Sequence, residues 1–161
     1  MNCKWIIFLV SLLTGQYASA QMDNAQMSVW VNEAIVSTYT FTYSDFLQRK
    51  KEIAKYFTGG GWIAYSKALD TSKLTEVVTK NQYTVSAVAT LPPEIKKVGE
   101  HQWQAVMPLL VLYKNSNSKQ TQVLQVVLDF IDAPAGEGVR GLAITTLDAK
   151  ISTPPCSCST P

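Results

Sequence analysis

The sequence predicts an α+β fold in which N-terminal helices pack on a curved, four-stranded antiparallel sheet. Two observations support this prediction. Residues 23–80 place apolar side chains at helical spacing, whereas residues 82–148 alternate apolar and polar side chains with a period of two. Helices that precede a run of strands, instead of alternating with them, are typical of antiparallel sheets covered by helices on one face.

The first half of the chain carries signals for four helices. Asp23 and Gln26 predict a capping box for the first helix, whose apolar stripe is Met27, Trp30, Val31, Ala34, Ile35 and Thr38. Residues 39–43 are expected to link it to a second helix, which would begin after Ser44 and turn inward Phe46, Leu47, Ile53, Ala54 and Phe57. A third helix is expected over 62–69, and a fourth after Ser72 that ends in a left-handed cap at Asn81.

Three consecutive glycines, residues 59–61, separate the second helix from the third. A phosphate-binding loop would need a preceding strand and a following Gly-Lys-Ser/Thr, and both are missing from the sequence. We therefore expect these glycines to stop the second helix in a tight turn, where positive φ angles cost glycine little.

The second half of the chain predicts the sheet. Strands are expected over 83–90, 102–113, 121–131 and 142–147, and a short strand over 94–98 is left open. The expected inward-facing side chains of the two long strands are Trp103, Ala105, Met107, Leu109, Val111, Leu124, Val126, Leu128 and Phe130. Pro108 lies within a strand and requires an edge position or a bulge. A curved sheet around one long helix suits a cystatin-like, cone-shaped fold.

Residues 1–20 predict a secretory signal peptide. Lys4 precedes an apolar run over residues 5–13, and Ala18-Ser19-Ala20 matches the small-x-small pattern of a cleavage site between Ala20 and Gln21. The run is too short to span about 30 Å of hydrocarbon, although an uncleaved anchor remains the alternative. We expect an exported, periplasmic domain over 21–148 and a disordered, Pro/Ser/Cys-rich tail over 149–161.

The composition does not indicate a nucleic-acid-binding protein. Lysine and arginine number 14 against 12 acidic residues, so loss of Lys4 leaves 13 − 12 = +1, without the clustered basic excess of a nucleic-acid-binding protein. Residues 49–51 are basic, but Glu52 and Lys55 continue the same polar stripe, which favours a solvated helix face.

The cysteines of the processed chain lie near its C-terminus. Only Cys156 and Cys158 would remain after cleavage, so the fold is not expected to depend on disulfides. Their number and spacing do not suit a zinc site. They could form a strained redox pair, a crosslink between molecules, or two idle thiols, and neither a metal nor a cofactor is expected.

The sequence predicts no catalytic residue. His101 is the single histidine and lies in a predicted turn, with no Gly-x-Ser-x-Gly motif elsewhere in the chain. Asp45 and Tyr43 could imitate the Asp–Tyr pair of cone-shaped isomerases. The helix dipole alone, however, favours a carboxylate such as Asp45 at a helix start. We therefore expect a protein that is not an enzyme.

Four segments in order carry a more specific signal than these motifs. They are Tyr39-Thr-Phe-Thr-Tyr-Ser-Asp-Phe46, Tyr56-Phe57-Thr58 with Gly61-Trp62, Lys80-Asn-Gln-Tyr-Thr-Val-Ser-Ala-Val-Ala89, and Trp103-Gln-Ala-Val-Met-Pro-Leu-Leu-Val111. Over residues 28–147 the chain resembles the periplasmic domain of the DotI/IcmL family of type IVB secretion systems. The resemblance implies the fold of VirB-type assembly factors, and a structural role with secretion-apparatus subunits and other copies as partners. It implies no active-site residues.

The expected signal peptide departs from the family pattern, in which a cytoplasmic stretch precedes a permanent membrane anchor. The leading hypothesis is therefore an accessory, non-enzymatic periplasmic module of a Dot/Icm-like secretion or conjugation apparatus, which contacts the membrane only indirectly. It would bind apparatus subunits through its helical face or a sheet edge. The alternative is a small-ligand-binding or isomerase-like cone, which needs an enclosed pocket with two or more convergent polar groups.

Overall fold

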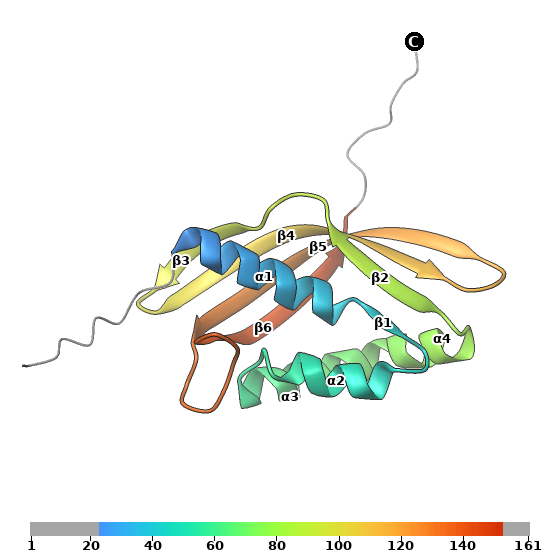
Figure 1. Cartoon of the computed structure of the whole chain (residues 1–161), viewed down its shortest axis with the longest axis horizontal. Helices are drawn as coiled ribbons and strands as arrows, with labels where there is room; N and C mark the ends of the chain where they lie inside the picture. The colour runs from blue at the N-terminus through green and yellow to red at the C-terminus, as the bar shows by residue number, and fades with distance from the viewer. Residues whose placement is uncertain (1–22, 153–161) are drawn as a thin grey trace, which may run out of the picture.

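The computed structural model describes residues 23–152, in which four helices accompany one antiparallel sheet (Figure 1). The elements are α1 (Asn24–Thr38), β1 (Phe41–Thr42), α2 (Phe46–Ala54), α3 (Gly59–Ser72), α4 (Leu74–Lys80), β2 (Thr84–Ala89), β3 (Glu94–Gly99), β4 (Gln102–Lys114), β5 (Lys119–Asp132) and β6 (Leu142–Ile151). The α+β class is confirmed. The expected cleavage site between Ala20 and Gln21, and Cys156 with Cys158, lie outside the described residues.

The sheet has six strands instead of the four predicted. Its order is β1-β2-β4-β5-β6, and β3 pairs with β4 beyond the end of β2. β1 was missed because its two residues are too few to show a period. The short strand that the sequence left open is β3. In Figure 1, α1 crosses the sheet, and α2, α3 and α4 lie together beside it.

α1 matches its prediction closely. The Asp23 carboxylate accepts a bond from the Gln26 N–H at 2.7 Å, and the Gln26 side chain accepts one from the Asp23 N–H, which completes the capping box. The whole predicted apolar stripe is buried. Trp30 lies at its centre, with its ring centroid 5.3 Å from that of Phe130 on β5. The helix therefore fills the inner face of the sheet.

α2 differs from its prediction at both ends. Its N-cap is Asp45, not Ser44, and the Asp45 carboxylate accepts a bond from the Thr42 N–H at 2.6 Å instead of capping the helix. Leu47 was expected to face inward but is 78% exposed. Phe57 is buried as expected, yet it lies beyond the helix, where it forms a parallel bridge with Ile144 of β6.

The three glycines begin a helix and do not stop one, so that prediction was wrong. Thr58 is the N-cap of α3, and its hydroxyl accepts a bond from the Gly61 N–H at 3.1 Å. None of the three has a positive φ. A Cβ on Gly61 would lie 2.5 Å from the Ile144 carbonyl oxygen, so glycine is needed for close packing of α3 on β6.

Smaller corrections concern the ends of α4 and β6. The left-handed residue after α4 is Gln82, with φ 51°, and Asn81 has φ −94°. β6 continues to Ile151, past the domain boundary predicted at 148. The predicted strand ended too early, because Asp148 and Lys150 continue to alternate with the apolar Leu147, Ala149 and Ile151.

The long strands confirm the predicted pattern. All the inward-facing side chains expected on β4 and β5 are buried. Pro108 is accommodated by a local edge, because β2 pairs with residues 109–114 of β4 and β3 pairs with residues 102–106. Between these two pairings, the Pro108 carbonyl accepts a bond from the Thr90 N–H. The nitrogen of Pro108, which has no hydrogen to donate, therefore faces the gap between β2 and β3.

Candidate functional site

The outer side of α1 and the loop between β2 and β3 form the two sides of an open groove of about 670 Å³. We call it the α1 groove. It is lined by Ser28, Val29, Asn32, Glu33, Val36, Ser37, Ala89, Thr90, Leu91, Pro92 and Pro93. The helix contributes one long side of the groove and the proline-containing loop contributes the other.

The α1 groove presents apolar side chains to solvent. Val29 is 61% exposed and Leu91 is 64% exposed. Pro92 and Pro93 keep the loop extended, since proline fixes φ. Apolar side chains gathered in a surface groove with polar neighbours are typical of a site that binds another protein.

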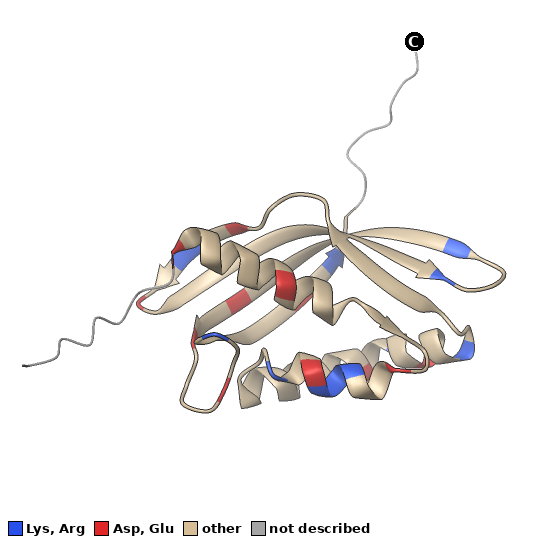
Figure 2. Cartoon of the chain, viewed as in Figure 1, with Lys and Arg blue, Asp and Glu red and all other residues tan. Residues whose placement is uncertain are grey.

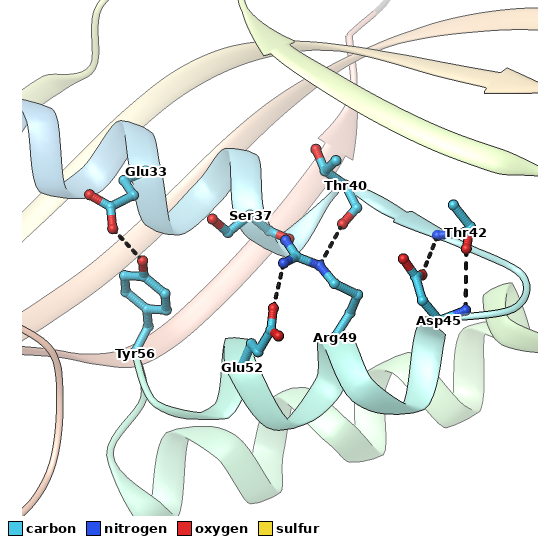
Figure 3. A network of polar contacts seen from close by, with 8 residues as sticks. All are labelled: Glu33, Ser37, Thr40, Thr42, Asp45, Arg49, Glu52 and Tyr56. Carbon is cyan, nitrogen blue, oxygen red and sulfur yellow. Dashed lines mark hydrogen bonds and ion pairs between the residues drawn. The ribbon is translucent and has the colours of Figure 1, made fainter.

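Polar contacts fix the helical side of the α1 groove. Glu33 accepts a hydrogen bond from the Tyr56 hydroxyl at 2.5 Å (Figure 3). It also pairs with Arg140 from the loop before β6. The bond from Tyr56, with help from Arg140, lowers the pKa of Glu33 despite partial desolvation. Burial and the neighbouring Glu33 raise the pKa of Tyr56. Three segments distant in the sequence therefore meet at this carboxylate.

Arg49 fixes the end of α1, a role that the sequence did not reveal. Its guanidinium donates to the Thr40 carbonyl at 3.1 Å and the Ser37 carbonyl at 3.4 Å, and pairs with Glu52 at 2.5 Å (Figure 3). A cation here also complements the C-terminal end of the helix dipole. The basic run over residues 49–51 is therefore only partly a solvated helix face. Acidic and basic residues lie side by side on α2 (Figure 2).

The other residues considered from the sequence do not converge on a site. His101 is exposed and bonds Asp132 at 2.5 Å. Asp45 is held by Thr42, and Tyr43 is 44% exposed. Within residues 23–152 no group of three or more His, Cys, Asp or Glu is arranged to hold a metal ion.

The inner face of the sheet is occupied by side chains of the protein itself. Trp103 stacks on Phe130 with 5.6 Å between ring centroids, and Trp30 covers Phe130 from α1. Burial raises the pKa of Tyr39 and Tyr65 well above the usual tyrosine value, so both phenols stay neutral. This packing does not supply the enclosed polar pocket that the ligand-binding alternative requires.

No helix between residues 23 and 152 combines the length and the apolar character that a membrane crossing requires.

The fold places the protein in a structural class found in type IV secretion components. The periplasmic domain of DotI is 24% identical and superposes with a TM-score of 0.77, covering 83% of this chain and 99% of that one. Agrobacterium tumefaciens VirB8 is 8% identical, with a TM-score of 0.56 over 83% of this chain and 96% of that one. At these identities the likeness concerns the fold alone.

The sequence identifies the family within this class. Residues 16–151 match the DotI/IcmL family, described as an inner-membrane complex component of the type IVb secretion system. An IcmL-like type IV secretion system protein from Legionella pneumophila is 55% identical, with a TM-score of 0.81 over 85% of this chain and 99% of that one. The chain belongs to the DotI/IcmL family. A search of curated proteins gave no match.

Proposed function

We propose that this protein is a non-enzymatic interaction module of the type IVb secretion apparatus that works in the periplasm. Membership of a family of inner-membrane complex components carries the proposal. The DotI domain of the same fold is periplasmic, which supports the compartment. The α1 groove, with exposed apolar residues and no converging catalytic groups among the described residues, supports binding over catalysis.

Within the apparatus we propose an accessory role. The signal expected over residues 1–20, cleaved between Ala20 and Gln21, would release the domain from the membrane. A released domain would reach the inner-membrane complex through protein contacts, with only indirect contact with lipid. N-terminal sequencing of the protein from periplasmic extracts tests this point, and Gln21 is the expected first residue. A retained N-terminus in the membrane fraction would contradict it.

We propose that the α1 groove binds an apolar segment of another apparatus subunit. Val29 and Leu91 face solvent from its two sides, and Glu33, which also lines the groove, is already paired with Arg140. An apolar segment fits these walls because it would bury Val29 and Leu91 without leaving either charge unpaired.

Affinity purification from a strain that carries the apparatus tests this surface. The tagged chain should recover inner-membrane complex subunits, and Val29→Asp with Leu91→Asp should reduce their recovery at least about tenfold, because a desolvated carboxylate opposes apolar binding. Leu47→Asp is the matched control, since Leu47 is exposed on α2, outside the groove. Equal recovery with all variants would exclude the groove, and recovery of no subunit would exclude the function.

A further inference from the structure

Among residues 23–152, nothing pairs with the outer edge of β6 over its second half. Tyr56 and Thr58 cover the first half, where the Ile144 N–H donates to the Tyr56 carbonyl and the Ile144 carbonyl accepts from the Thr58 N–H. Beyond Ile144, no described residue forms a backbone hydrogen bond to this outer side. We call residues 146–151 the β6 edge. Unpaired N–H and C=O groups in an extended strand are a template for another strand.

The direction of each backbone group follows from the ladder with β5. The Ser152 N–H donates to the Val123 carbonyl of β5 at 2.9 Å, so residue 152 points its backbone groups inward. Successive residues of a strand point these groups to opposite sides. Leu147, Ala149 and Ile151 therefore direct their N–H and C=O groups outward from the sheet.

The side chains of the β6 edge are self-complementary in an antiparallel arrangement. A two-fold axis through Ala149 would place Leu147 opposite Ile151 of a second copy, with Asp148 opposite Lys150. The first pair is apolar and the second has opposite charges, and both kinds of cross-strand pair stabilise antiparallel sheets. This register also makes hydrogen-bonded pairs of the three residues whose backbone groups point outward.

The same charges disfavour other registers. An axis through Asp148 would oppose two aspartates, and an axis through Lys150 would oppose two lysines, which is destabilising. Charged residues on an edge strand usually prevent pairing, but here their signs fit one register. In the single chain neither Asp148 nor Lys150 pairs with a described residue of opposite charge. Ile151 is 69% exposed and would gain an apolar neighbour.

We infer that the β6 edge joins two copies of this chain into a two-fold dimer with one continuous antiparallel sheet. The occupant of the edge is a second copy because its charge pattern is complementary to itself. This surface is separate from the α1 groove, and its use does not depend on the proposed function.

Sedimentation velocity of the full chain over a concentration series tests the dimer. We expect a reversible monomer–dimer equilibrium. Asp148→Lys should raise the dissociation constant roughly tenfold, because two attractive charge pairs become repulsive. The double variant Asp148→Lys with Lys150→Asp should restore the wild-type value, since opposite charges again face each other. Glu94→Lys makes the same charge change on β3 and should leave the dimer intact.

A backbone variant provides an independent readout. Ala149→Pro removes an N–H that the dimer uses but that points to solvent in the monomer, so it should abolish dimerisation without changing the circular dichroism spectrum. A protein that is monomeric at every concentration would overturn the inference. A dimer that is insensitive to both Asp148→Lys and Ala149→Pro would also overturn it, because another surface would then hold the copies together.

Discussion

Glu33 connects three segments through one carboxylate, and this gives the stability of the protein a defined pH dependence. Its pKa is lowered in the folded state by Tyr56 and Arg140. A group with a lowered folded pKa contributes stability above its unfolded pKa, here about 4.5, and loses that contribution as the pH falls through the folded value. Because the Glu33 side chain is 41% exposed, the contribution is under about 1 kcal/mol.

We therefore expect Glu33→Gln to lower the melting temperature more at pH 7 than at pH 3. Thermal unfolding of both proteins across this range measures the difference, which should shrink steadily below about pH 4.5. Asp23→Asn removes a carboxylate from the other end of α1 and serves as a comparison without the Tyr56 and Arg140 contacts. A Glu33→Gln deficit that stayed constant down to pH 3 would contradict this account of the network.

Gly61 is the residue at which the backbone of α3 comes closest to the sheet. An added Cβ would meet the carbonyl oxygens of Ile144 and Thr145 at 2.5 and 2.9 Å. Gly61→Ala should therefore destabilise the protein by about 1–3 kcal/mol, as overpacking does. Gly60→Ala is the matched control, because nothing lies within 4 Å of its added Cβ. Urea unfolding should separate the two variants, and equal stabilities would mean that α3 packs differently.

At the scale of elements, the connection after α2 is anchored by Phe57. Its ring stacks on Tyr65 at 5.1 Å and contacts the edge of Trp62 at 5.6 Å, and only 3% of the residue is exposed. Phe57→Ala should cost about 3–5 kcal/mol in unfolding free energy. Leu47→Ala should cost under about 0.5 kcal/mol, because Leu47 is exposed. A loss of under about 1 kcal/mol for Phe57→Ala would contradict the buried position of this side chain.

Elements were predictable from the sequence where a period runs over many residues. α1, β4 and β5 follow their expected faces because each buries one continuous stripe. α2 was predicted to extend too far because Phe57 follows Ile53 at helical spacing, although the helix ends at Ala54. The role of Gly61 depends on contact with β6, which is distant in the sequence. Local signals cannot reveal such contacts.

The candidate site was less predictable than the fold. The sequence suggested a helical face or a sheet edge as the binding surface, without specifying which residues form it. The α1 groove joins residues 28–37 to residues 89–93, and only the packing of α1 on the sheet brings them together. Arg49 was read as part of a solvated run because its partners, Ser37 and Thr40, are backbone carbonyls. A backbone carbonyl leaves no sign in the sequence.

At the scale of the whole molecule, the family and the expected signal peptide point to different attachments. Members of the family are components of the inner-membrane complex. Cleavage of the expected signal peptide would instead leave this domain free in the periplasm. The two are compatible if protein contacts replace the membrane anchor. The α1 groove offers a contact for another subunit, and the β6 edge offers one for a second copy.

Site-specific photocrosslinking from position 29 in living cells that carry the secretion apparatus tests the central claim most directly. A photoreactive residue at Val29 lies in the α1 groove, and one at Leu47 provides a control on α2. We expect position 29, but not position 47, to crosslink to a subunit of the inner-membrane complex. The same pattern of crosslinks from both positions, or crosslinks from position 29 only to proteins outside the apparatus, would contradict the claim.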